Sequence, residues 1–142
     1  MRGVNIVYKL LSIDAAAVTR NLMLQNTETN TVEKVFDDSD LINEGETFEF
    51  MEIGKTYDCK LALFGSMKQR HVGKWRKFNI LKANVKIGVR LFLEVEAEQD
   101  IYYISQKNVP GYESMKSFMF EYSRLDLIQV NSLNSGNLYL DY

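Results

Sequence analysis

Three stretches of the sequence alternate between apolar and polar residues, and this pattern constrains the fold more than any other feature. They cover residues 55–65, 81–87 and 90–98. Successive side chains of a β-strand point to opposite faces, so a period of two residues predicts strands with one buried face. Such strands are typical of antiparallel sheets that meet the core on one side and water on the other. The residues expected on the buried face are Tyr57, Cys59, Leu61, Leu63, Leu81, Ala83, Val85, Ile87, Leu91, Leu93, Val95 and Ala97.

Shorter segments of β character fill much of the remaining chain. Residues 4–13 are apolar on both faces, as in a strand covered on two sides, and the polar residues 27–30 suit a hairpin loop. Gly88 and residues 98–100 favour tight turns. Further strands are expected at residues 21–26, 31–36, 47–51, 101–104, 117–122, 127–133 and 138–142. We expect a capped helical turn at 38–45, a helical turn or loop at 14–20, a loop at 106–114 and a last turn at 132–137.

Length and composition favour one β domain. The chain has 142 residues, of which 46% are hydrophobic and 25% charged, and these values are typical of a single globular domain. A chain of this size buries ~68–70% of its unfolded surface, which supports a core without disulfides or metals. We therefore expect an all-β fold, with one small antiparallel barrel over residues 1–142 that is OB-like or otherwise partly open and carries one or two short helical turns. A closed up-and-down barrel is the alternative.

Several features predict a cytoplasmic protein without a membrane segment. No apolar run approaches the ~18 residues of a transmembrane helix. The first residues lack the apolar stretch and small-residue cleavage site of a secretory signal. Cys59 is the only cysteine, so no disulfide can form within the chain. All three observations fit a cytoplasmic, reducing compartment.

The motifs of catalysis and cofactor binding are absent from the sequence. The eight glycines form neither G-x-G-x-x-G nor G-x-x-x-x-G-K-[ST], the patterns that hold nucleotide phosphates. One histidine and one cysteine cannot supply a structural zinc site; we expect His71 in an exposed loop and Cys59 in the core. We therefore expect no catalytic residue, no metal and no cofactor, and a protein that is not an enzyme. A carboxylate pair assembled in space is the open alternative, because it leaves no trace in the sequence.

Basic residues concentrate in one segment of a chain whose formal net charge is −2. Five of the 17 Lys and Arg residues fall within positions 68–77, and no acidic residue interrupts them. Acidic residues concentrate between positions 33 and 58, and again in a stripe formed by Glu94, Glu96, Glu98 and Asp100. The candidate binding loop comprises Lys68, Arg70, His71, Lys74, Trp75, Arg76 and Lys77.

The preferred function is non-catalytic binding of a macromolecule, as a protein–protein interaction module of inhibitor or immunity type. One Trp, eight Tyr and eight Phe exceed what the alternating core positions need, and aromatic residues anchor interfaces. Phe64 and Phe92 fall on the outward phase of their strands, so they cover either a second layer or an exposed patch. The acidic stripes would steer a basic protein partner.

The alternative function is binding of single-stranded nucleic acid through the basic aromatic loop at 68–78. Its cations would follow the phosphates, and Trp75 would stack on a base. The acidic stripes oppose this function unless they face away from the loop. A solvated loop with Trp75 and Phe78 packed on the barrel explains the same residues without a ligand. The sequence leaves the oligomeric state open.

Overall fold

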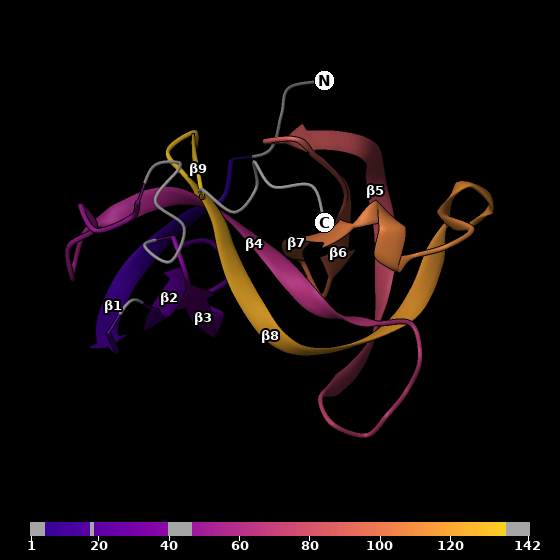
Figure 1. Ribbon diagram of the computed structural model, residues 1–142, viewed down its shortest axis with the longest axis horizontal. Coiled ribbons are helices and arrows are strands. Elements are labelled where there is room, and N and C mark those ends of the chain that lie inside the picture. Colours follow the sequence, from indigo (N-terminus) through magenta and orange to yellow (C-terminus); the bar gives the residue numbers. More distant parts are fainter. Residues whose placement is uncertain (1–4, 18, 40–46, 136–142) are drawn as a thin grey trace.

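The structure is a computed structural model, and it describes residues 5–17, 19–39 and 47–135 (Figure 1). Nine strands and two single turns of 3-10 helix make up this part of the chain. The strands are β1 (Val7–Ala15), β2 (Arg20–Asn26), β3 (Val32–Asp37), β4 (Thr56–Ser66), β5 (Lys74–Ile87), β6 (Arg90–Ala97), β7 (Asp100–Ser105), β8 (Ser117–Val130) and β9 (Leu133–Asn134), and the 3-10 turns are η1 (Gln106–Asn108) and η2 (Tyr112–Ser114). The predicted all-β class with short helical turns is confirmed.

The strands form one sheet that closes on itself through the pairing of β4 with β8. The strand order is β3-β2-β1-β4-β7-β6-β5-β8-β9, and additional pairings join β8 to β3 and to β4. These pairings trace two closed circuits, β1-β2-β3-β8-β4 and β4-β7-β6-β5-β8, which share β4 and β8. In Figure 1, β8 runs as a long curved strand beside β4. The closure is ring-like and not a clean barrel, so the partly open form of the prediction is the one observed.

The main core lies on the face that the alternation predicts. Leu61, Leu63, Leu93 and Val95 are all buried there, with aromatic residues from β5, β7 and β8 around them. A smaller cluster lies on the opposite face of the sheet. It consists of Ala62, Ile87, Phe92, Tyr103 and Ile128. Of the two outward phenylalanines, Phe92 therefore belongs to a second buried layer, whereas Phe64 is 53% exposed.

The prediction fails at several positions of the β5–β6 hairpin. Leu81 and Leu91 are expected to be buried, but both are exposed. The register of β5 against β6 shifts between Ile80 and Lys82 and again before Val85, because β5 contains extra residues. These residues place Val85 and Ile87 against the smaller cluster on the opposite face, which a strict period of two cannot anticipate. Leu91 keeps the phase of Leu93 and is exposed near the start of β6.

Several predicted strand bounds also change. The strands expected at 117–122 and 127–133 are one strand, β8, which continues through Ser123 because a register shift in its pairing with β4 absorbs the extra residue. In β1, Tyr8 and Leu10 are buried but Leu11 is exposed, so this strand is not covered on two sides.

The segment at 47–51 is a bend and turn instead of the expected strand. Of the predicted helical turn or loop at 14–20, residues 14, 15 and 20 belong to β1 and β2, Ala16 N donates to Thr19 O between the strands, and residue 18 lies outside the described residues. The hairpin loop at 27–30, the turns at Gly88 and 98–100, the strand at 101–104 and the loop at 106–114 form as predicted. The final turn begins at Asn131 instead of Ser132. Most of 38–45 and all of 138–142 lie outside the described residues.

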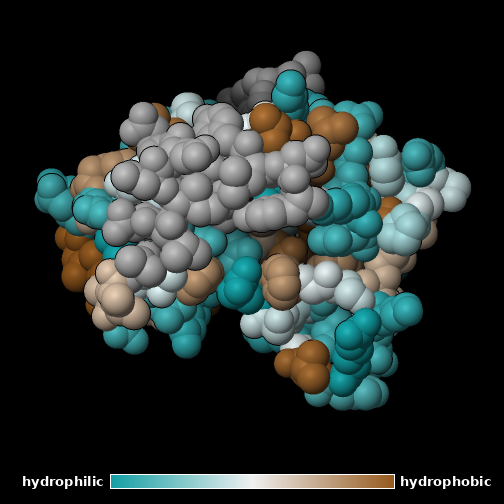
Figure 2. All heavy atoms as spheres, viewed as in Figure 1, coloured by the Kyte–Doolittle hydropathy of each residue, from teal (hydrophilic) through white to brown (hydrophobic). Residues whose placement is uncertain are grey.

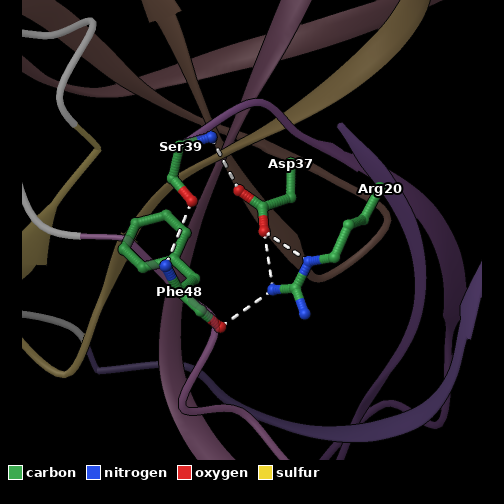
Figure 3. A network of polar contacts seen from close by, with 4 residues as sticks. All are labelled: Arg20, Asp37, Ser39 and Phe48. Atoms are coloured by element: carbon green, nitrogen blue, oxygen red, sulfur yellow. Dashed lines mark hydrogen bonds and ion pairs between the residues drawn. The ribbon is translucent and has the colours of Figure 1, made fainter. Parts of the chain in front are cut away.

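A polar network fixes the chain after β3 to the β2–β3 pair (Figure 3). Arg20 donates from Nε and Nη2 to Oδ2 of Asp37, at 3.0 and 2.7 Å, and from Nη2 to the carbonyl oxygen of Phe48 at 2.8 Å. Ser39 N donates to Asp37 Oδ1, and Ser39 Oγ accepts from Phe48 N. Because the Asp37 carboxylate is paired with the Arg20 guanidinium, the network holds the Phe48 ring in the core without an unpaired buried carboxylate.

A second buried carboxylate fastens the β2–β3 hairpin to the turn before β7. Asp100 accepts hydrogen bonds from Thr29 Oγ1 at 2.7 Å, Thr31 Oγ1 at 2.8 Å and Asn26 Nδ2 at 3.4 Å. These contacts join the two circuits of the sheet at a second place, far in sequence from the β4–β8 pair. A carboxylate that the sequence presents as part of an acidic stripe is therefore an internal crosslink.

Replacing Leu61 or Leu93 by alanine tests the buried phase. Both side chains are fully buried, so each truncation should lower the free energy of unfolding by about 2–5 kcal/mol through lost transfer energy and a residual cavity. Leu91→Ala is the matched control, since Leu91 is 44% exposed and should cost about 1 kcal/mol or less. Chemical denaturation measures all three. Equal losses for Leu91 and Leu93 would contradict the observed exposure of Leu91.

Candidate functional site

The predicted basic segment divides between a loop and the start of a strand. β4 ends at Ser66 and β5 begins at Lys74, so Lys68, Arg70 and His71 lie in the connection between them. This connection, residues 67–73, is called the basic loop, and it projects from the sheet at the bottom of Figure 1. Figure 2 shows mainly hydrophilic side chains over this projection. The other predicted residues are in β5, paired with β8: Lys74, Trp75, Arg76 and Lys77.

The carboxylate of Glu121 in β8 holds the basic loop. It accepts hydrogen bonds from the backbone N–H groups of Arg70, His71 and Val72 at 2.6, 3.0 and 2.8 Å. His71 has a left-handed φ of 58°, and this conformation helps to aim successive N–H groups at one anion. Burial acts to raise the pKa of Glu121, but the backbone hydrogen bonds outweigh it and lower the pKa. The loop is thus ordered around an internal negative charge.

Glycines at both ends let the basic loop approach β8 closely. A Cβ atom on Gly65 would lie 1.8 Å from the carbonyl oxygen of Glu121, and one on Gly73 would lie 2.3 Å from that of Tyr122. No side chain fits at these distances, so the loop path beside β8 depends on glycine at both positions.

The strand geometry of β5 sends Lys74 and Arg76 to one face and Trp75 and Lys77 to the other. Arg76 lies on the same face as the buried Phe78, and its Nη1 donates to the hydroxyl of Tyr122 at 3.0 Å. Trp75 lies on the other face, across from Glu121 in the register with β8, and is half-buried. The seven predicted residues therefore do not form one surface. Lys74 and Arg76 belong to one face of β5, and Trp75 and Lys77 to the other.

Two adjoining clefts flank the basic loop. One, of about 430 Å³, lies between β3, β8 and the end of the loop, and Lys34, Lys74 and Arg124 are among its lining residues. The other, of about 240 Å³, lies on the side of Lys68 and Arg70. Val72 and Ser123 line both clefts, so the two clefts adjoin at these residues. Together they are called the basic groove, and their cations are Lys34, Lys68, Arg70, Lys74 and Arg124.

An arginine stacked between two phenylalanines joins the groove to the outer face of the sheet. The guanidinium carbon of Arg124 lies 4.8 Å from the ring centre of Phe36 in β3 and 4.4 Å from that of Phe64 in β4. Asp126 accepts from Arg124 Nε at 2.6 Å and from Nη2 at 3.1 Å. Stacking and bidentate pairing both favour arginine over lysine at this position.

The acids near the groove are mostly engaged inside the protein. Glu33 lines the larger cleft and accepts a hydrogen bond from the hydroxyl of Tyr102. Burial raises the pKa of Glu33, which the hydrogen bond from Tyr102 only partly offsets. Glu94 and Asp100 are buried, so the predicted acidic stripe at 94–100 is not a continuous surface. That removes one objection to an anionic ligand and weakens the argument for a basic protein partner.

The histidine and the cysteine occupy the places expected of them. His71 is exposed in the basic loop, and its backbone N–H contacts Glu121. Cys59 is buried in the main core, and burial raises the pKa of its thiol to about 12. The thiol is therefore protonated at neutral pH.

Three residues of the groove, and a phenylalanine that stacks on one of them, were not predicted from the sequence. Lys34, Phe36, Glu121 and Arg124 come from β3 and β8, about 30 to 50 positions away from the basic loop. Each is an isolated charge or ring within its own strand, so no local signal marks it. Pairing of β3 and β4 with β8 brings these residues to the groove.

The chain matches no model of a known protein family, no curated protein and no solved structure. Within residues 5–17, 19–39 and 47–135, no group of three or more His, Cys, Asp and Glu residues is arranged to hold a metal ion. The same residues include no helix long and apolar enough to cross a membrane. The chemistry of the basic groove is that of its own side chains: ammonium and guanidinium groups beside one exposed aromatic ring.

Thiol labelling tests the buried state of Cys59. Because the thiolate is scarce and the side chain is enclosed, a thiol reagent should react slowly with the native protein and rapidly after denaturation. The reaction is followed with a chromogenic disulfide reagent at neutral pH. Equal rates for the native and denatured protein would show that the thiol is accessible and reactive.

Exchange of Glu121 for glutamine tests how the basic loop is held. The pKa of Glu121 is lower in the folded protein than its ordinary 4.5, so the charged form stabilises the fold above that pH, and the contribution is lost as the pH falls through the folded-state pKa. The difference in unfolding free energy between the wild type and Glu121→Gln should be largest at neutral pH and shrink below pH 4.5.

Comparison of the two proteins cancels the titration of all other carboxyl groups. Glu113→Gln, at an exposed acid in η2, is the matched control and should show a small difference at every pH. A Glu121→Gln difference that does not change with pH would mean that the carboxylate charge does not order the loop.

Proposed function

We propose that the protein binds single-stranded nucleic acid in the basic groove, without catalysis. The observation that carries the proposal is the convergence of five cations from four parts of the chain on one groove beside an exposed aromatic ring. Proteins that hold single strands combine cations that follow the phosphates with aromatic rings that stack on bases. The basic loop is fixed by Glu121, so the backbone that carries its cations is ordered before any ligand arrives.

The architecture and the placement of the acids support the same function. The circuit β1-β2-β3-β8-β4 has five strands, as do the partly open OB-type barrels that bind oligonucleotides. The acids closest to the groove are bonded internally: Glu33 with Tyr102, Asp126 with Arg124, and Glu121 with the basic loop. A net charge of −2 is therefore compatible with a locally positive groove.

Protein binding is the second candidate, and a different surface favours it. A cavity of about 400 Å³ at the end of the β5–β6 hairpin is lined by Val89, Leu91 and Tyr112, and the first two are exposed. Exposed apolar residues around a concave surface are typical of interaction sites. An inhibitor or immunity role and a cytoplasmic location stay predictions.

The salt dependence of strand binding tests the proposed function. Each phosphate contact to a single strand contributes about 0.7 to the slope of log affinity against log salt concentration. Lys34→Gln combined with Lys74→Gln should weaken binding of a fluorescently labelled mixed-sequence strand and lower the slope by about 1.4. Fluorescence anisotropy at several salt concentrations measures both quantities.

Lys82→Gln combined with Lys86→Gln is the matched control. These lysines are exposed and lie at least eight residues farther along β5, so the pair changes the net charge equally without touching the groove. The control should bind like the wild type. Absence of saturable binding by the wild type at about 100 μM strand in low salt would refute the proposal.

A further inference from the structure

We infer that Phe64, backed by Arg124, is the position where an unpaired base of the bound strand stacks. This inference rests on the proposed function and adds the part of the ligand that the groove recognises. It differs from the prediction made from the sequence, which gives the stacking role to Trp75.

The first argument is the exposure of the Phe64 ring. Phe64 is on the outward phase of β4 and remains 53% exposed, although the guanidinium of Arg124 lies only 4.4 Å from its ring centre. More than half of the ring is therefore open to a partner in solution. Its π face is suited to any nucleobase, because stacking does not depend on sequence.

The second argument is that the ring is already held in place. Arg124 pairs with Phe64 in the β4–β8 register, stacks on it and on Phe36, and is fixed at its other edge by two hydrogen bonds to Asp126. A ring supported in this way loses little conformational freedom when a base arrives. The guanidinium also adds a cation–π contribution to a stacked arrangement.

The third argument is the position of the ring relative to the cations. Phe64 lines the smaller cleft together with Lys68 and Arg70, so a base on the ring brings its own phosphate into the cationic part of the groove. Trp75 is not among the described residues that line either cleft. It is half-buried on β5, across from the Glu121 carboxylate that the basic loop encloses.

This placement predicts the class of nucleic acid. In a duplex the bases are stacked on one another, so a ring on a protein surface reaches them only at an end or an opened site. A base on Phe64 therefore requires an unpaired nucleotide, and the groove should prefer single strands to duplexes of the same length. The cations alone would favour the duplex, which carries more charge per unit length.

The experiment compares a strand that carries bases with an abasic strand of the same length. Phe64→Leu removes the ring and keeps an apolar side chain, and it should weaken binding of the strand with bases by about 5- to 150-fold. Binding of the abasic strand should change less than about twofold, because its phosphates still meet the cations. Phe64→Tyr keeps the ring and should restore affinity for the strand with bases. Fluorescence anisotropy measures all affinities.

Phe50→Leu is the matched control, since Phe50 is also an exposed phenylalanine but lies before β4 and outside the groove. It should leave both affinities unchanged. Wild-type binding of both strands with equal affinity, or equal losses for both strands in Phe64→Leu, overturns the stacking position and leaves phosphate binding intact. Failure of the wild type to bind any strand overturns the proposed function with it.

Discussion

The pairing of β4 with β8 is the interaction on which the rest of the structure depends. Both closed circuits of the sheet contain these two strands, so the pairing of β4 with β8 closes each circuit. The pair tolerates little change where the chains approach most closely, because a Cβ on Gly65 would collide with the carbonyl oxygen of Glu121. Its two register shifts bend the strands, and the bend allows one sheet to close in a ring-like way.

The candidate site is a consequence of the same pairing. The register shift beside Ser123 places Arg124 across from Phe64 and Glu121 across from Ser66, where the basic loop begins. One strand thus supplies both the cation that stacks on the exposed ring and the carboxylate that orders the loop. A slip of one residue would send both side chains to the core face and leave the loop without its anchor.

The sequence predicts the strands well where the alternation is unbroken, and poorly where a bulge intervenes. Leu61 and Leu93 are buried as expected, whereas the register shifts in β5 move Val85 and Ile87 from the predicted face to the opposite one. The run of basic residues is evident in the sequence. That Trp75 faces away from its neighbours Lys74 and Arg76, however, follows only from the start of β5 at Lys74. The partners from β3 and β8 depend on long-range pairing, which no local pattern encodes.

The charge of the groove illustrates why net charge is a poor guide to the surface of this fold. A buried carboxylate must be paired or hydrogen-bonded, so each acid drawn into the structure requires donors from its surroundings. Asp100 takes them from the β2–β3 hairpin, Asp37 from Arg20, and Glu121 from the backbone of the basic loop. Glu121 uses N–H groups in place of side-chain cations, so the ammonium and guanidinium groups of the loop stay directed at solvent. The backbone hydrogen bonds that stabilise the Glu121 carboxylate therefore leave the basic side chains of the loop exposed, and an acidic chain acquires a cationic groove.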